Sequence, residues 1–387
     1  MSINGKAYIV GAFEHPTRKA EDKSIPQLHA ECARGALEDA GLTFDDIDGY
    51  FCAGDAPGLG PLSMADYMGL RKLRHFDSTE CGGSAPIVHV GHAAEAIAMG
   101  KCDIALVTLS GRPRTLAMPR TMPNSIHCPD IPFEGPYGAV TAPVYGLVAT
   151  RHMHEFGTTR EQMAWVKVAA SHHAQHNPFA MLPKVVTVED VLNSPPVASP
   201  LNRLDCCVIS DGGGAVIVTK PEIARSLKRP KVKILGAAES PKLQNGGDVD
   251  ITHTGARWSG PRAFAEAKVT QKDIKYVSIY DSFTITVIVT LEDLGFCEKG
   301  QGGKFVADGN LISGVGKLPF NTDGGGLCNN HPASRGGMTK IIEAVRQLRG
   351  EAHPAVQVMN CDIALAHGTG GFIATRTGGA TLIMERE

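Results

Sequence analysis

The chain has 387 residues, with 38 lysine and arginine residues against 40 aspartate and glutamate residues, and a formal net charge of -2 at pH 7. Such a balance supplies no basic field for phosphate groups, which excludes nucleic acid and anionic membranes as expected partners. Hydrophobic residues make up 43% and charged residues 20% of the sequence, values that exclude an intrinsically disordered chain. The length predicts two to three domains of about 150 residues each.

The ten cysteines are scattered along the chain, without a CxxC pair. This spacing indicates neither a zinc site nor a disulfide framework. The pairs His152 with His154 and His172 with His173 lack a third ligand at metal spacing, so no metal is expected. The N-terminal residues show no signal-peptide pattern, and no apolar run reaches the roughly 18 residues of a membrane span. We therefore expect a cytoplasmic, soluble protein.

Strand and helix patterns alternate through the first hundred residues. Short apolar runs predict strands, apolar residues at helical spacing predict helices, and Gly41 is placed to end the first helix. In chain order we expect a strand over 7–13, a helix over 25–40, strands over 47–53 and 76–81, a helix over 86–99 and a strand over 103–109. This succession predicts an α/β fold with a mainly parallel sheet under covering helices.

Residues 111–200 interrupt the alternation with proline-rich stretches and with helices predicted over 145–156 and 160–176. So long an excursion indicates a loop or cap domain inserted at the functional edge of the sheet. Strands resume at 215–219 and 232–238. We therefore expect three parts: residues 1–110 with 201–225 as a first half, residues 111–200 as the inserted domain, and residues 226–387 as a second half.

The sequence also contains an internal repeat. Residues 36–47 read ALEDAGLTFDDI and residues 263–274 read AFAEAKVTQKDI, so that five residues recur at a constant offset, and a strand is predicted directly after each copy. Self-similarity of this kind reports architecture, which favours a duplicated unit. Two unrelated amphipathic helices with similar ends are the alternative.

Each half places a glycine-rich turn before a helix, at residues 82–84 and at residues 324–332, and the glycine clusters at 212–214 and 324–326 predict loops. A helix N-terminus presents unpaired N–H groups and partial positive charge, which stabilise oxyanions and thiolates. Cys81 comes immediately before the first turn and is a candidate nucleophile. A small buried side chain on a strand is the alternative for this cysteine.

Three further side chains are candidates for acid–base chemistry. His331 lies in an Asn-Asn-His-Pro string whose proline restricts the histidine backbone, and an imidazole has a suitable unperturbed pKa. Tyr280 and His367 follow strands predicted over 277–279 and 363–366, and ligands gather at such strand ends in parallel sheets. Packing at a strand tip is the alternative for Tyr280. Asp281 is expected to be the N-cap of the helix that follows it.

Together these features resemble the thiolase superfamily, most closely the sterol-carrier-protein-type thiolases and the thiolase-like lipid-transfer proteins. The resemblance extends along the whole chain and is most specific in GGGLCNNHP at 324–332, LEDLGFC at 291–297 and EAVRQLRG at 343–350. It implies a duplicated five-layered αβαβα thiolase fold, a homodimer, and a reaction of lipid degradation that makes or breaks a carbon–carbon bond next to an acyl-CoA thioester. Coenzyme A would be a substrate, with no bound cofactor. Family members of this subtype often work with a small partner that carries a zinc ribbon and an OB domain, and the resemblance extends that expectation to this chain.

The resemblance also implies roles for individual residues. His331 would activate the nucleophile, and His367 would move the α-proton of the substrate. The oxyanion or the substrate would be bound by Gly83, Ser84, Asn330, Gly370 and Gly371. The nucleophile departs from the family pattern, because counting back from Gly100 places its slot at Gly83 or Ser84, and Cys81 lies about two residues early.

Thiolase-like aldolases of steroid side-chain breakdown also lack this nucleophile and are thought to use tyrosines, one in a Tyr-Asp-x-Phe string like residues 280–283. Two enzyme hypotheses follow from the sequence. The first is a thiolase-type acyltransferase on a 3-oxoacyl-CoA, with Cys81, His331 and His367. The second is a retro-aldolase on a 3-hydroxyacyl-CoA, with Tyr280 and His331 handling the hydroxyl proton and no covalent intermediate. A non-catalytic scaffold subunit of an acyl-CoA complex is the third hypothesis.

Overall fold

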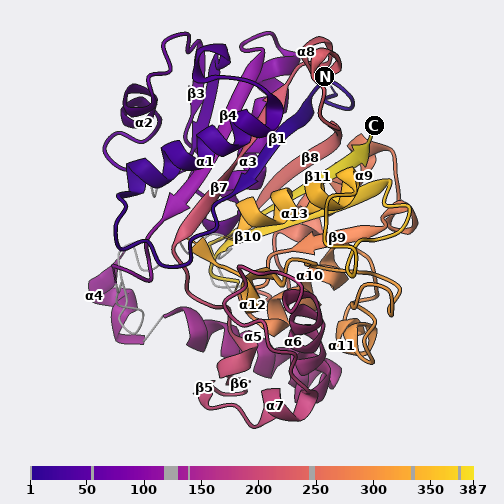
Figure 1. The fold of residues 1–387 in the computed structure, drawn as a ribbon. Helices are drawn as coiled ribbons and strands as arrows, with labels where there is room; N and C mark the ends of the chain where they lie inside the picture. The colour runs from indigo at the N-terminus through magenta and orange to yellow at the C-terminus, as the bar shows by residue number, and fades with distance from the viewer. Residues whose placement is uncertain are drawn as a thin grey trace.

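A computed structural model describes residues 2–53, 56–116, 130–137, 140–243, 249–332, 336–373 and 376–387. Within them, one sheet has the strand order β3-β2-β4-β7-β1-β8-β11-β10-β9, and β5 and β6 form a small second sheet (Figure 1). The strands are β1 (Tyr8–Glu14), β2 (Gly49–Cys52), β3 (His75–Asp77), β4 (Ile104–Gly111), β5 (Pro196–Ala198), β6 (Leu201–Asn202), β7 (Gly212–Thr219), β8 (Val232–Lys242), β9 (Tyr276–Ile279), β10 (Ile363–Gly371) and β11 (Thr377–Arg386).

Strand pairing in the large sheet is mixed. β2 pairs in parallel with β3 and β4, and β9 pairs in parallel with β10, as the alternation of strands and helices predicts. The other pairs, from β4 through β7, β1, β8 and β11 to β10, are antiparallel. The two halves meet where β1 pairs with β8, with Tyr8 opposite Lys233. Parallel pairing therefore lies toward both ends of the sheet.

Helices form three layers around the strands. α1 (Ile25–Ala40) covers β1, β7 and β4 on one outer face, and α9 (Ala256–Ala267) covers β8 and β11 on the other. α3 (Ala85–Ala98) and α13 (Gly337–Arg349) contact each other and strands of both halves, so they form the central layer. This order confirms the expected αβαβα arrangement. Two short helices, α2 (Pro61–Met68) and α8 (Pro221–Ser226), complete the first half.

The first helix illustrates how local sequence sets the boundaries of an element. Ser24 lies in extended backbone before α1, and its hydroxyl oxygen accepts a hydrogen bond from the Gln27 N–H at 3.2 Å. Gly41 ends the helix in the left-handed conformation with a φ of 72°, which costs glycine little. Both ends coincide with the predicted range.

The internal repeat corresponds to equivalent structure in the two halves. A 3₁₀ turn of Phe44–Asp46 joins α1 to β2, and a 3₁₀ turn of Gln271–Asp273 joins α9 to β9. In each turn the threonine N–H and hydroxyl donate to the aspartate carboxylate three residues later, at 2.8 Å in all four bonds. The shared residues recur because both copies need the same capping box before the second strand.

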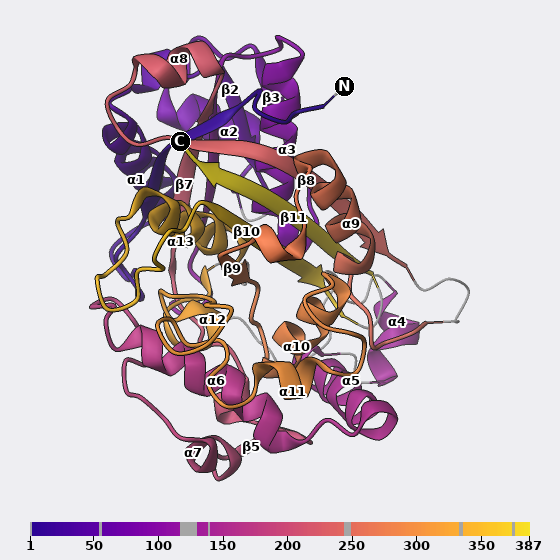
Figure 2. The same cartoon turned by 90° about the vertical axis from the view of Figure 1, so that its right-hand side faces the viewer.

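Between β4 and β7 the chain forms helices at one end of the molecule (Figures 1 and 2). They are α4 (Ile131–Glu134), α5 (Thr141–Phe156), α6 (Arg160–Ala174) and α7 (Val188–Leu192). α6 packs against α10 (Thr284–Asp293), α11 (Gly302–Val306) and α12 (Gly325–Cys328), so this segment shares a core with the second half. Residues 117–129 and 138–139 of the expected insertion lie outside the described residues.

Two local predictions need correction. The glycines at 212–214 belong to β7 and do not form a loop. Glycine is needed in this strand because a Cβ atom at Gly213 would lie 2.1 Å from the Leu109 carbonyl oxygen of β4. The third predicted strand ends at Asp77, so Cys81 is not a strand residue. Among the helices in the described ranges, none is long and apolar enough to cross a membrane.

Candidate active site

Tyr280 and His331 are neighbours in space although they come from different elements. Tyr280 follows β9, and its N–H donates to the His367 carbonyl oxygen at 2.9 Å. Its ring meets the His331 imidazole edge-on, with the ring centroids 5.3 Å apart and the planes at 73°. Both side chains are buried, each about 5% exposed. The structure therefore brings together a phenol and an imidazole, two groups able to transfer protons.

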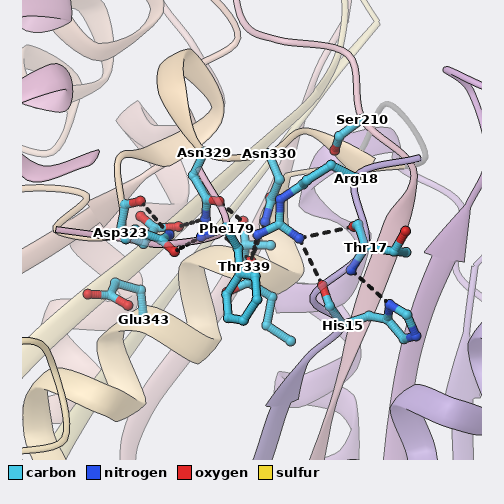
Figure 3. Close-up of polar contacts among 12 residues, drawn as sticks. His15, Thr17, Arg18, Phe179, Ser210, Asp323, Asn329, Asn330, Thr339 and Glu343 are labelled. Atoms are coloured by element: carbon cyan, nitrogen blue, oxygen red, sulfur yellow. Dashed lines mark hydrogen bonds and ion pairs between the residues drawn. The ribbon is translucent and has the colours of Figure 1, made fainter. Parts of the chain in front are cut away.

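The loop that carries His331 is held by residues from both halves of the fold. The His331 N–H donates to Ser210 Oγ at 3.0 Å. The Asn329 side chain donates to Asp323 at 2.9 Å and accepts from Arg18 at 2.8 Å (Figure 3). Because Arg18 belongs to the segment after β1, the histidine loop is fixed across the boundary between the two halves.

Asn330 is turned toward a buried carboxylate. Its amide nitrogen donates to Glu14, the last residue of β1. Burial would raise the pKa of Glu14, but the guanidinium groups of Arg346 and Arg18 outweigh burial and hold that pKa below its ordinary value. Glu14 accepts from Arg346 at 3.0 Å and from Arg18 at 2.6 Å. The Asn330 N–H₂ group, predicted to bind substrate, thus serves to hold the loop in this structure.

The first glycine-rich turn lies against Tyr280. Cys81 is the residue before a 3₁₀ turn of Gly82–Ser84, and α3 begins directly afterwards. The Ser84 hydroxyl donates to the Cys81 carbonyl oxygen at 2.7 Å, so it closes the turn. A Cβ atom added at Gly83 would lie 2.3 Å from Tyr280 Cε2. The tyrosine ring therefore occupies the space that a side chain at position 83 would need.

Glycines of β10 complete the same region. A Cβ atom at Gly370 would lie 1.7 Å from the Cys81 carbonyl oxygen, and one at Gly368 would lie 2.8 Å from Ser84 Cα. A Cβ atom at Gly82 would in turn meet the Gly371 nitrogen at 2.7 Å. Only residues without side chains let the first turn approach the strand so closely. Gly370 and Gly371, both predicted to bind substrate, thus pack against the turn that contains Gly83.

His367 lies away from this group. Side chains alternate along a strand, so its ring faces away from the turn that Gly368 and Gly370 contact. Its Nδ1 atom lies 2.9 Å from Thr381 Oγ1, whose hydroxyl is also 2.9 Å from Ser259 Oγ on α9. Burial lowers the pKa of His367 to about 3, which keeps the ring neutral. The backbone of His367 thus lies beside Tyr280, but its ring faces away from the turn against which the Tyr280 ring packs.

Asp281 caps a helix other than the one predicted. Phe283, not Asp281, is the N-cap of α10. The Asp281 carboxylate instead accepts hydrogen bonds from the N–H groups of Gly326 and Leu327 in α12, at 2.8 and 3.1 Å. It also pairs with Lys340 of α13 at 3.0 Å. Sequence reasoning missed Lys340, whose signal is a cation beside the apolar residues Met338, Ile341 and Ile342 of the same helix.

Comparison with known proteins gives the family. The Thiolase C-terminal domain-like family matches residues 238–386. Acetyl-CoA acetyltransferase of Methanothermobacter thermautotrophicus is 34% identical over 97% of each chain. The chain belongs to the thiolase superfamily. It is a thiolase-like enzyme, and the expected fold and family are both confirmed.

Other relatives in this superfamily carry names of a different reaction type. The 17-hydroxy-3-oxo-4-pregnene-20-carboxyl-CoA lyase of Mycobacterium tuberculosis is 33% identical over 95% of this chain and 97% of its own. The solved structure of the Ltp2-ChsH2(DUF35) aldolase superposes with a TM-score of 0.89 at 31% identity, covering 99% of this chain and 98% of the other. Acyltransferases and carbon–carbon lyases are thus both similar to this thiolase-like chain.

Proposed function

We propose that this thiolase-like protein cleaves a 3-hydroxyacyl-CoA by a retro-aldol reaction, or forms one in reverse, without an acyl-cysteine intermediate. The observation that carries this proposal is the position of Tyr280, whose ring lies where a side chain at Gly83 would extend. Position 83 is one of the two that the family pattern assigns to the nucleophile. A phenol in place of a thiol there favours proton transfer over acyl transfer.

The reaction needs one proton transfer before the carbon–carbon bond breaks and one after it. A base removes the proton of the substrate 3-hydroxyl group, and the electron pair of that O–H bond forms the carbonyl of a ketone or aldehyde. The bond between carbons 2 and 3 breaks, and its electron pair passes to the thioester as an enolate. An acid then protonates carbon 2 to release the shortened acyl-CoA. Tyr280 and His331, with rings 5.3 Å apart, supply a pair of groups for these transfers.

Peptide N–H groups of the first turn would stabilise the enolate. This turn opens the 14-residue helix α3, and a helix N-terminus favours negative charge. A well-placed donor to such an oxyanion contributes about 3 kcal/mol in comparable sites. The contacts of Gly82 and Gly83 with the glycines of β10 keep the turn in place for this role.

Thiolysis of a 3-oxoacyl-CoA remains the second candidate, because one observation favours it. Cys81 is partly exposed and lies four residues before the start of α3, where partial positive charge favours a thiolate. His331 would then be the base that activates the thiol. The 34% identity to an acetyl-CoA acetyltransferase also fits this candidate. His367 is not proposed for either reaction, since its ring faces the side of β10 opposite to the first turn.

The two reactions differ in their need for free coenzyme A. We expect the protein to convert a 3-hydroxyacyl-CoA to a shorter acyl-CoA and a carbonyl compound without added coenzyme A, and Cys81→Ala to retain at least half of that rate. Mass spectrometry after rapid quenching should find Cys81 unmodified. An acyl group on Cys81, together with loss of turnover in Cys81→Ala, would establish thiolysis instead. Binding of acyl-CoA without any turnover would favour the scaffold hypothesis.

The assembly is also a proposal. We expect a homodimer and a small partner subunit with a zinc ribbon and an OB domain, and the similarity to the Ltp2-ChsH2(DUF35) aldolase supports a second subunit. Among the strands that the structure describes, β3 lies at one end of the order of the large sheet, and Phe76 on it is 49% exposed. Light scattering and co-purification test both expectations, and a fully active monomer would contradict them.

A further inference from the structure

Two buried charges form an ion pair next to Tyr280 in the chain. Asp281 and Lys340 are each 1% exposed, and their N···O distance is 3.0 Å. Burial alone would lower the pKa of Lys340, but Asp281 foremost, followed by Asp323 and Glu343, raises it above its ordinary value. The lysine is therefore a buried cation surrounded by carboxylates, and each of the two paired charges depends on the other.

The Asp281 carboxylate also holds the start of α12 in place by hydrogen bonds. It accepts the N–H groups of Gly326 and Leu327 at 2.8 and 3.1 Å. A Cβ atom at Gly325 would lie 2.2 Å from Asp281 Oδ2, so the glycine allows the carboxylate to approach. One side chain thus satisfies two N–H groups that a helix start leaves without partners.

Both reacting side chains lie within a few residues of this carboxylate. Tyr280 precedes Asp281 in the chain, and His331 follows α12 after only Asn329 and Asn330. The N–H groups of these two asparagines donate to the Gly325 carbonyl at 2.8 and 3.2 Å, so the segment from α12 to the histidine is a continuous hydrogen-bonded turn. Fixing α12 on Asp281 therefore fixes the place of the imidazole relative to the phenol.

We propose that Asp281 and Lys340 are positioning residues for the reaction, a buried ion pair that sets the placement of Tyr280 against His331. The inference deepens the proposed function and rests on it for the identity of the reacting pair. Asp281 connects the two loops, and Lys340 holds the Asp281 carboxylate in the orientation in which it accepts both amides. Neither residue transfers a proton to or from the substrate.

The test compares Lys340→Met with Lys299→Met. Lys299 is partly exposed and pairs with the buried carboxylates of Glu292 and Asp293, each at 3.2 Å, so its replacement removes an ion pair at the end of α10 that the inference does not involve. We expect Lys340→Met to lower kcat for 3-hydroxyacyl-CoA cleavage about 10- to 100-fold with KM within threefold, because misplacement by about 1 Å costs up to about 100-fold. Lys299→Met should keep kcat within twofold.

A second readout does not depend on the reaction. The measurement is NMR spectroscopy of protein with isotope-labelled histidine. The imidazole signals of His331 are assigned by their loss in His331→Gln. We expect Lys340→Met to shift these signals and Lys299→Met to leave them in place. If Lys340→Met does not fold, Asp281→Asn provides the same comparison, because it removes the charge and keeps one acceptor oxygen.

The double variant Asp281→Asn/Lys340→Met decides whether the two residues act as a unit. Its kcat should be no lower than that of Lys340→Met alone, since effects within one interacting pair are not additive. Three outcomes would each overturn the inference. The losses of the two single variants could multiply in the double variant, or Lys340→Met could show wild-type kcat and unshifted His331 signals. The third is an effect of Lys299→Met equal to that of Lys340→Met. Should the wild-type enzyme perform thiolysis, the proposed function fails, and the imidazole signals still decide the positioning role.

Discussion

Replacement of Gly83 by alanine tests the central feature of the site, the packing of Tyr280 against the first turn. An ideal Cβ atom at position 83 would lie 2.3 Å from Tyr280 Cε2 and 2.5 Å from Tyr280 Cζ. Carbon atoms in contact stay about 3.5 to 4.0 Å apart, so the ring or the turn must move by more than about 1 Å. The added atom would also lie 2.5 Å from the Thr369 carbonyl oxygen on β10, so retreat toward the strand is blocked.

The cost should appear in both rate and stability. A displacement of this size at a reacting group lowers kcat about 100-fold, and overpacking of one methyl group costs about 1–3 kcal/mol of unfolding free energy. Gly91→Ala on α3 is the matched control, since its Cβ atom would meet only Ala237 Cβ, at 3.1 Å. The control should keep wild-type kcat and change the unfolding free energy by less than about 1 kcal/mol.

Urea unfolding and steady-state cleavage of a 3-hydroxyacyl-CoA measure the two effects. The destabilisation by Gly83→Ala should be smaller in a Tyr280→Ala background, with a coupling of about 1–3 kcal/mol, because the tyrosine ring is then absent and only the Thr369 contact remains. A Gly83→Ala enzyme with wild-type kcat and stability would refute the placement of the ring. Equal destabilisation in both backgrounds would assign the cost to the Thr369 contact alone.

Three further predictions concern other residues of the site. Tyr280→Phe keeps the ring and removes the hydroxyl, so kcat should fall by about 10² to 10⁴, and retained activity would rule the phenol out as an acid or base. Glu14→Gln removes the anion between Arg18 and Arg346 and should lower the unfolding free energy in urea by about 3 kcal/mol, whereas a neutral effect would show that the histidine loop does not need this carboxylate. The pKa of His367 is lowered by burial from 6.5 to about 3, so between these values the unfolded chain binds a proton that the folded chain does not, and stability falls as pH drops through this window. His367→Gln should therefore reduce the slope of unfolding free energy against pH between 6 and 4 by up to about 1.4 kcal/mol per pH unit, and an unchanged slope would contradict the burial of a neutral ring.

Local sequence signals determined where helices and turns of this protein begin and end, and their recurrence indicated its duplication. Capping residues such as Ser24, the glycine at 41 and the Thr-Asp pairs of the two 3₁₀ turns act over a few residues, so their effects are readable in the chain. The motif around His331 likewise indicated a loop with a candidate acid–base side chain. Pairing of distant strands does not leave such a local signal, which is why the antiparallel centre of the sheet was not predicted.

The tertiary structure decided which candidates meet. Tyr280 directly follows β9 and His367 lies within the neighbouring strand β10, yet alternation along β10 turns the histidine ring away from the turn at Gly83 while the tyrosine ring packs against it. The ion pair of Asp281 with Lys340 joins residues 59 positions apart in the chain, and only the packing of α13 against β9 makes them neighbours. The sequence determined which groups were available for chemistry, and the close approach of glycine backbones decided which of them share one site, because that approach depends on contacts between both halves.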